Sequence, residues 1–219
     1  WSGEETGEVF TDLLRDRFLH ADPAIRLESG ASTLELAAQG RRMIEAYLAQ
    51  IDARESVLGV GVPFSVPLVD ASGERLCKPV IGEFDLVVEH DGAPVIVDWK
   101  TSARRWPKDK ARTDLQPTCY LHAWTSMHGS RAEFRFDVVT KAKSPVCEQH
   151  EARREPDDFT RLAETVRVLD RTLDAECFLP TDASWQCKSC PYSLACQSWH
   201  RERATTRVHF ERPVLELAA

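Results

Sequence analysis

The fold of this chain is decided by residues 81–100, which read IGEFDLVVEHDGAPVIVDWK. Two runs rich in valine and isoleucine flank Asp91-Gly92, a strong signal for a two-residue hairpin turn. A two-residue turn fixes the register of the strands, and that register places Asp85 directly opposite Asp98. We therefore predict a β-hairpin that brings two aspartates together.

Side chains alternate between the two faces of a strand, so this hairpin has one polar and one apolar face. The polar face carries Glu83, Asp85, Val87, Ile96, Asp98 and Lys100. The apolar face carries Phe84, Leu86, Val88, Val95, Val97 and Trp99. We expect the apolar face to pack on the core and the polar face to form a site.

The facing aspartates predict a cation site. Carboxylates on directly opposed positions, with Cβ atoms roughly 5 Å apart, repel each other unless a cation lies between them. Carboxylate oxygens are ligands that Mg²⁺ and Mn²⁺ prefer. Lys100, two residues after Asp98 on the same face, is placed to orient or deprotonate a water beside the metal. The alternative is an exposed sheet face with scattered charges.

The composition is that of a globular protein with one sizeable core. The chain has 219 residues, of which 42% are hydrophobic and 29% charged. No apolar run approaches the roughly 20 residues of a membrane span, and no secretory signal is visible. Seven cysteines without such a signal suggest a reducing, cytoplasmic compartment.

A basic segment directly after the hairpin is the candidate DNA-binding surface. The net charge of −7 argues mildly against a nucleic-acid partner, but phosphate contacts need only a local basic stripe. The segment supplies Arg104, Arg105, Lys108, Lys110 and Arg112. The alternative is a solvated loop.

Periodicity places further elements around the hairpin. Helices are expected at residues 6–19, 33–52, 114–128 and 156–174, with further strands at 57–69 and 132–140. On the third helix Gln116 and Tyr120 are four residues apart and share a face, although such a pair can also be an ordinary surface pair.

Cysteine spacing near the C-terminal end predicts a metal–thiolate site. Cys187, Cys190 and Cys196 follow a C-x₂-C-x₅-C pattern, and thiolates this close are ligands for zinc or iron–sulfur. His200 would complete a Cys₃His zinc set. Three unrelated reduced thiols are the alternative.

These motifs together resemble the PD-(D/E)xK phosphodiesterase superfamily. The Asp…Asp-x-Lys hairpin, the Gln-x-x-x-Tyr helix and the cysteine run are similar to those of RecB-like nucleases with a C-terminal iron–sulfur cluster, such as the AddB nuclease domain and the CRISPR-associated adaptation nucleases. The likeness spans roughly residues 7–200. It implies an α/β fold: a restriction-endonuclease-like core, with a central mixed sheet flanked by helices, over residues 1–175 and a cysteine-cluster appendage over 176–219.

The resemblance also implies an activity. It implies a Mg²⁺- or Mn²⁺-dependent deoxyribonuclease, exonucleolytic on single-stranded DNA or DNA ends, in repair, recombination or CRISPR adaptation, with a helicase or CRISPR adaptation complex as partner. The implied catalytic residues are Asp85, Asp98, Lys100, Gln116 and Tyr120, with the Trp99 backbone carbonyl as a further metal ligand. Cys187, Cys190 and Cys196 would hold a [4Fe–4S] cluster.

Two departures from the family pattern keep other functions open. No cysteine precedes Cys77, so the family's upstream cluster ligand is absent, replaced by His200 or Cys177, or the cluster is different; we favour loss of an N-terminal segment. Thr11 stands where the family often has a metal-binding histidine, and Glu8 or Asp12 is a candidate substitute. A catalytically weak or inactive DNA-binding scaffold subunit and a zinc-stabilised interaction module are the alternatives.

Overall fold

The computed structural model describes residues 3–21, 32–70, 72–76, 78–177, 186–187 and 190–205. The chain divides into two compact units, Trp1–Arg167 and Val168–Ala219. The predicted domain boundary after residue 175 stays a prediction. None of the described helices is long and apolar enough to cross a membrane.

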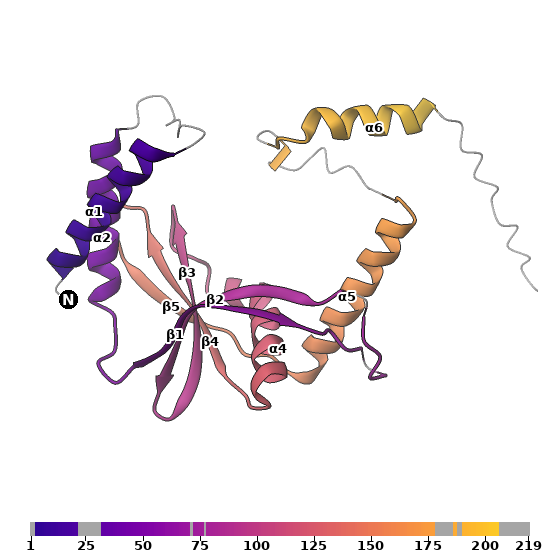
Figure 1. The fold of residues 1–219 in the computed structure, drawn as a ribbon, viewed down its shortest axis with the longest axis horizontal. Helices are drawn as coiled ribbons and strands as arrows, with labels where there is room; N and C mark the ends of the chain where they lie inside the picture. Colours follow the sequence, from indigo (N-terminus) through magenta and orange to yellow (C-terminus); the bar gives the residue numbers. More distant parts are fainter. Residues whose placement is uncertain are drawn as a thin grey trace, which may run out of the picture. The chain divides into compact units, whose positions relative to one another are not determined.

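A five-stranded mixed sheet forms the centre of the first unit (Figure 1). The strands are β1 (Ser56–Val66), β2 (Val80–His90), β3 (Ala93–Ser102), β4 (Glu133–Thr140) and β5 (Cys147–Glu151), and they lie in this order across the sheet. Neighbours are antiparallel except β3 and β4, which are parallel. This sheet with its flanking helices confirms the predicted restriction-endonuclease-like α/β fold.

The predicted hairpin is β2–β3. Asp91 and Gly92 have φ values of 51° and 81°, the left-handed conformation that a type I′ turn requires at both central residues. The ladder starts at His90 opposite Ala93 and continues to Leu86 opposite Val97, in the register that the turn predicts.

The described helices belong to both units, and α6 lies in the second unit. Their bounds are α1 Gly3–His20, α2 Thr33–Leu48, α3 Lys110–Thr113, α4 Gln116–His128, α5 Pro156–Asp174 and α6 Ser193–Thr205. The predicted second helix ends four residues early, at Leu48, and the third begins at Gln116 rather than at Asp114. The sequence patterns did not predict α3, β5 or α6.

The core lies on both faces of the hairpin, and here the prediction of one core face and one site face is wrong. Val87 and Ile96, from the predicted site face, are buried with Phe136 in the main core, on the side that α4 covers. Phe84 joins this same core. The remaining apolar residues of the hairpin form a separate buried cluster of Leu86, Val88, Val95 and Val97.

Trp99 is also not a core residue, because 42% of it is exposed. Its ring lies edge-on to Tyr47 of α2, with ring centroids 5.9 Å apart. Asp98, the preceding residue, instead contacts Gln116 of α4. Successive residues of a strand point to opposite faces, so α4 and α2 lie on opposite faces of the sheet at this position.

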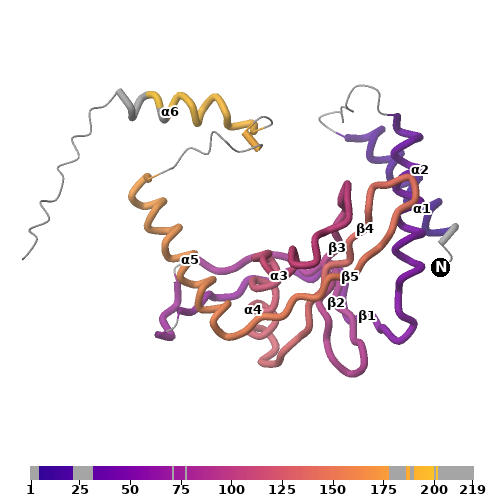
Figure 2. The backbone as a smooth tube through the Cα atoms, turned by 180° about the vertical axis from the view of Figure 1, so that it is seen from behind, coloured from indigo at the N-terminus to yellow at the C-terminus, as the bar shows by residue number. Residues whose placement is uncertain are grey.

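The helices α1 and α2 lie side by side (Figures 1 and 2). Glycines permit their close approach: a Cβ atom on Gly40 would lie 2.4 Å from the Phe10 ring. The side chain of Gln39 donates a hydrogen bond to the Lys141 carbonyl at 3.2 Å, which ties α2 to the loop after β4. The two helices therefore form a layer attached to the sheet through α2.

Candidate active site

The two aspartates lie where β2 and β3 stop pairing. The last paired residues of the ladder are Leu86 and Val97, and Asp85 and Asp98 follow immediately. Beyond this point β2 continues to pair with β1, and β3 with β4. The predicted pairing of Asp85 directly opposite Asp98 is therefore not formed in the ladder, because the strands have separated.

Asp85 bridges the two strands at this point. Its carboxylate Oδ2 accepts a hydrogen bond from the Trp99 backbone N–H at 3.0 Å, across the end of the β2–β3 ladder. A side chain thus satisfies a backbone donor that has no β2 carbonyl opposite it. This bond fixes the Asp85 carboxylate next to β3.

Asp98 is the buried centre of the site, with 1% of its surface exposed. Its Oδ1 accepts a hydrogen bond from the Gln116 side-chain amide, and its Oδ2 contacts the Lys100 ammonium. Burial raises the pKa of Asp98; the Lys100 ammonium opposes this rise, and the negative charge of Asp85 adds to it.

Gln116 and Tyr120 reach the site from the first turns of α4. The Asp114 side chain accepts the Gln116 backbone N–H at 2.9 Å, which orders the start of the helix. The Gln116 side-chain amide also donates to the Tyr120 hydroxyl at 2.9 Å. The Tyr120 ring packs edge-on against Phe84, with centroids 5.4 Å apart, so the core holds the ring in place.

One connected group therefore contains Asp98, Lys100, Gln116 and Tyr120, with Asp85 beside it. A buried carboxylate held by an ammonium and an amide, next to a second carboxylate, is suited to phosphodiester chemistry with a divalent cation. A model of the PD-(D/E)XK nuclease superfamily matches residues 2–197.

The chain belongs to the PD-(D/E)XK nuclease superfamily.

Solved structures similar to this PD-(D/E)XK protein share little sequence with it. The crystal structure of SSO0001 matches 88% of this chain and 98% of its own, with 14% identity and a TM-score of 0.42. A protein from Eubacterium rectale named "Putative exonuclease" matches 79% of this chain and 67% of its own, with 16% identity and a TM-score of 0.40. No protein of curated function matches the sequence.

Members of this superfamily use Mg²⁺ or Mn²⁺, and the two aspartates fit a hard cation. Asp98 Oδ2 is buried and receives no well-aligned hydrogen bond within the described part of the chain, so its lone pairs are open to a cation that displaces or joins Lys100. Mg²⁺ keeps several waters and substrate oxygens as ligands, so two carboxylates suffice.

The first helix adds no ligand to the aspartates. Among the described residues no three His, Cys, Asp or Glu side chains form a metal-sized group, so neither Glu8 nor Asp12 completes the site. The hydroxyl of Thr11 donates to the Gly7 carbonyl at 2.8 Å within α1. The Thr11 hydroxyl of this PD-(D/E)XK protein is therefore hydrogen-bonded within its own helix.

The basic segment is partly held by the protein itself. Arg105 forms an ion pair with Glu148 of β5 at 3.3 Å, and the Lys110 ammonium lies 3.9 Å from the centroid of the Trp106 ring. Trp106 is anchored in turn against Phe136, with centroids 5.1 Å apart. The exposed side chains of Arg104, Lys108 and Arg112 form no ion pair in the part of the chain that the structure describes.

Trp106 and Tyr47 are two site-supporting residues that sequence reasoning did not single out. Trp106 was visible as an aromatic residue inside a basic segment, which is a signal for an anchored loop. Tyr47 lies within the predicted helix over residues 33–52, and nothing local indicates its contact with Trp99.

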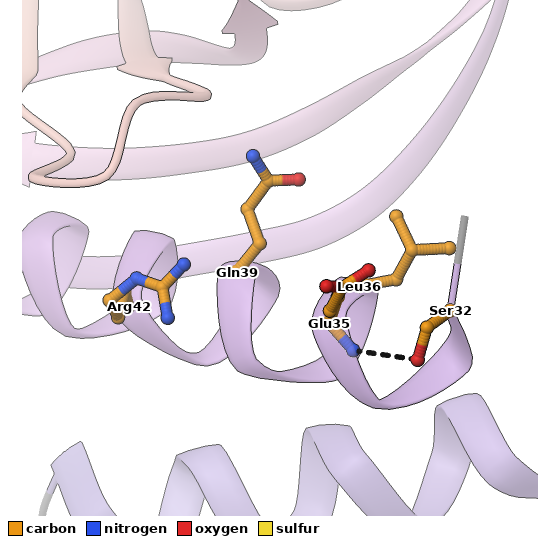
Figure 3. Close-up of a pocket in the computed structure, with 5 residues that line it drawn as sticks. All are labelled: Ser32, Glu35, Leu36, Gln39 and Arg42. Carbon is orange, nitrogen blue, oxygen red and sulfur yellow. Dashed lines mark hydrogen bonds between the residues drawn. The ribbon is translucent and has the colours of Figure 1, made fainter. Parts of the chain in front are cut away.

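A pocket at the start of α2 contains none of the predicted site residues (Figure 3). It is lined by Ser32, Glu35, Leu36, Gln39 and Arg42. The Ser32 hydroxyl accepts the Glu35 backbone N–H at 3.5 Å and caps the helix. A groove beside the basic segment is lined by Arg105, Trp106, Lys108, Glu148, Gln149, His150 and Glu151.

The cysteine segment belongs to the second unit. Cys187, Cys190 and Cys196 are reduced, and the Cys190 backbone N–H donates to the Cys187 carbonyl at 3.4 Å. Within the described residues, the three thiols do not converge into a metal-sized group. The His200 side chain, the candidate zinc ligand, lies outside the described residues.

Burial of the Asp98 charge leads to a prediction for the metal-free protein. Burial raises the pKa of Asp98 in the folded protein above its pKa in the unfolded chain. The stabilisation that protonated Asp98 contributes is therefore complete below the unfolded pKa, and it is lost as the pH rises through the folded pKa. Metal-free Asp98→Asn protein should therefore melt a few degrees above wild type at pH 7, with the difference closing towards pH 4. About 1 kcal/mol corresponds to roughly 2–4 °C at this size. Thermal melts in chelator across this pH range measure it, and equal melting temperatures at pH 7 would contradict it.

Proposed function

We propose that this PD-(D/E)XK protein is a metal-dependent deoxyribonuclease that hydrolyses phosphodiester bonds. The observation that carries the proposal is the contact of Asp98 with both Lys100 and Gln116, beside Asp85, where β2 and β3 separate. This arrangement supports the proposal because Asp85, Asp98 and Lys100, the three residues of the superfamily's Asp…Asp-x-Lys pattern, lie together at this point of the fold.

Each residue has a proposed role. Asp85, Asp98 and the Trp99 carbonyl would hold Mg²⁺ or Mn²⁺, which when bound lowers the pKa of a coordinated water and offsets phosphate charge. Lys100 orients the attacking water and stabilises the charge that develops on the phosphate. The attacking water loses a proton to solvent as its oxygen bonds to phosphorus and the ester P–O bond breaks, and the leaving oxygen takes up a proton from solvent. Gln116 and Tyr120 position the scissile phosphate.

The proposed substrate is single-stranded DNA or DNA ends, cut exonucleolytically. The direct test is cleavage of linear and circular DNA, in single- and double-stranded forms, with and without Mn²⁺. We expect Mn²⁺-dependent loss of linear substrates and persistence of circular ones. Equal loss of circular DNA would show an endonuclease, and no loss of any substrate would refute the proposal.

We propose a helicase or a CRISPR adaptation complex as the partner, supported by the resemblance to nucleases of such complexes.

The free basic residues should set DNA affinity. Replacing Arg104 and Lys108 with serine is expected to weaken binding and to lower the slope of log K against log salt by about one for each lost phosphate contact. Fluorescence anisotropy with labelled DNA in Ca²⁺, over a range of salt concentrations, measures both quantities.

Arg105 provides the matched control, because it lies in the same segment but is paired with Glu148. Arg105→Ser should change the slope less than Arg104→Ser does. If all of these variants bind with an unchanged slope, the basic segment is only solvated and DNA enters elsewhere.

A second candidate function is a DNA-binding scaffold with weak or no turnover. The observation that favours it is Thr11, whose hydroxyl is bound to its own helix where related nucleases place a metal-binding histidine. Mn²⁺-independent DNA binding without cleavage would select this function over the nuclease.

We also propose a metal–thiolate centre at Cys187, Cys190 and Cys196, with [4Fe–4S] as the first candidate and zinc with His200 as the second. The spacing and the backbone hydrogen bond between Cys190 and Cys187 support it. Three thiolates are one ligand short of a four-ligand set, so the fourth must come from another residue. Anaerobically purified protein should absorb near 400 nm if iron–sulfur is bound, and metal analysis would identify zinc.

If such a centre forms, it is structural. Metal–thiolate sites contribute folding free energy directly, on the order of 10 kcal/mol for structural zinc. Cys190→Ser should then lower the melting temperature and expose residues 177–200 to protease. Cys77→Ser is the control, because this cysteine lies outside the motif and is not a candidate ligand. Unchanged melting and protease resistance would mean that the three cysteines are ordinary thiols.

A further inference from the structure

Arg154, in the link between β5 and α5, makes an unusual set of contacts for a half-buried arginine. Its guanidinium donates to the Thr118 hydroxyl at 2.7 Å, and to the backbone carbonyls of Ala111 at 3.2 Å and Asp114 at 2.5 Å. A fourth bond goes to the Arg153 carbonyl at 2.8 Å. No carboxylate of the described chain lies within ion-pair distance of it.

Three of these four acceptors lie in residues 111–118. This segment joins the end of the basic loop to the first turn of α4, and Gln116 lies inside it. The Arg154 side chain is half-buried, so the guanidinium is partly removed from water, and this burial lowers its pKa. Its hydrogen bonds to main-chain carbonyls therefore have few competing waters, and they restrain the backbone of the segment directly.

We propose that Arg154 is a positioning residue that holds the Gln116 turn against Asp98. The role rests on the proposed nuclease function. The four hydrogen bonds of Arg154 go neither to the aspartates nor to Lys100, so it acts through the backbone around Gln116. The Asp114 side chain also holds this turn, by accepting the Gln116 backbone N–H. Loss of the guanidinium releases the carbonyls of Ala111 and Asp114 and lets the start of α4 move.

The effect on catalysis should be large because the Gln116 amide must meet both Asp98 and Tyr120. A displacement of about 1 Å at a positioning element can cost on the order of 100-fold in rate. We expect Arg154→Ala to lower kcat by about 10- to 100-fold, with KM for DNA within about threefold of wild type. Arg154→Lys keeps the charge but lacks the planar fork, so its kcat should lie between the two.

Arg153 is the matched control. It is the neighbouring residue with the same charge, but its side chain is 90% exposed and its ion pair with Glu151 is long, at 4.0 Å. Arg153→Ala should leave kcat and KM within about twofold of wild type, because surface pairs of this kind contribute little. A loss of kcat with Arg153→Ala equal to that with Arg154→Ala would assign the effect to net charge and overturn the proposal.

A double-mutant cycle tests whether Arg154 acts through Gln116. In a Gln116→Ala background, Arg154→Ala should cost less than about twofold further, because the group that it positions is gone. Full additivity of the two losses would overturn the proposed route. Thr118→Val removes one of the contacts while keeping the side-chain shape, so it should lower kcat by a smaller factor than Arg154→Ala does. This variant tests the proposal even if Arg154→Ala fails to fold.

Backbone hydrogen exchange separates this inference from the proposed function. In the absence of DNA, amides in residues 111–118 should exchange faster in Arg154→Ala than in wild type or Arg153→Ala. Unchanged exchange there would overturn the positioning role even in an active enzyme. If wild type cleaves no DNA, the proposed function fails, and the exchange result alone decides whether Arg154 holds this segment.

Discussion

Asp98→Asn is expected to lower DNA cleavage by about a thousandfold or more, with the fold intact. Asparagine keeps the shape of Asp98 and an acceptor for Gln116, but it removes half of the paired negative charge that would hold the cation, an effect worth several kcal/mol in the transition state. Lys100→Met should cost about 100- to 1,000-fold, because it removes a cation aimed at the developing charge. Single-turnover cleavage in saturating Mn²⁺ measures both losses.

Asp109→Asn is the matched control for charge, since Asp109 is exposed and its side chain caps no helix. This variant should cleave at the wild-type rate. Circular dichroism would confirm that each variant is folded. If Asp98→Asn or Lys100→Met retains more than about a tenth of wild-type cleavage, the β2–β3 site is not where hydrolysis occurs.

Arg135→Met should lower the free energy of unfolding by about 3–5 kcal/mol, because it breaks a buried charge network. Arg135 of β4 lies between two carboxylates: its Nε donates to Asp137 at 2.9 Å, and its Nη2 donates to Glu55 at 3.0 Å. The three side chains are 10% exposed or less. Without the guanidinium, two buried carboxylates remain without their cation. Urea unfolding followed by tryptophan fluorescence measures the loss.

Arg153→Met removes the same charge from an exposed position and should change the unfolding free energy by less than about 1 kcal/mol. A double variant, Arg135→Met with Asp137→Leu, should recover part of the lost stability, since one buried charge is removed with its partner. If Arg135→Met unfolds at the wild-type urea concentration, the network does not contribute net stability.

Local sequence patterns predicted the hairpin well because the turn and the register are local properties. Asp91-Gly92 supplies the two left-handed residues of the turn, and the register that follows continues unchanged to Leu86 and Val97. The helix that carries Gln116 and Tyr120 was predicted from helical spacing for the same reason, although its start was placed two residues early.

Strict alternation failed at Phe84 and Trp99, for a tertiary reason. The pattern assigned both to one apolar face, but β2 and β3 separate after Leu86 and Val97 and take different neighbours. Phe84 then packs against Tyr120 of α4, whereas Trp99 meets Tyr47 of α2. Alternation still holds within each strand, but it cannot indicate whether two strands share a face after their pairing ends.

The amino-acid sequence by itself determined the strand register and the spacing of the aspartates, Lys100, Gln116 and Tyr120, because turn chemistry and helical periodicity act over a few residues. Only the tertiary structure decided that Asp85 binds the Trp99 backbone N–H, that Gln116 reaches Asp98, and that Arg154 donates to the Asp114 carbonyl. These contacts join residues 14, 18 and 40 positions apart. Hydrogen bonds over such separations depend on how sheet and helices pack, and no local pattern encodes them.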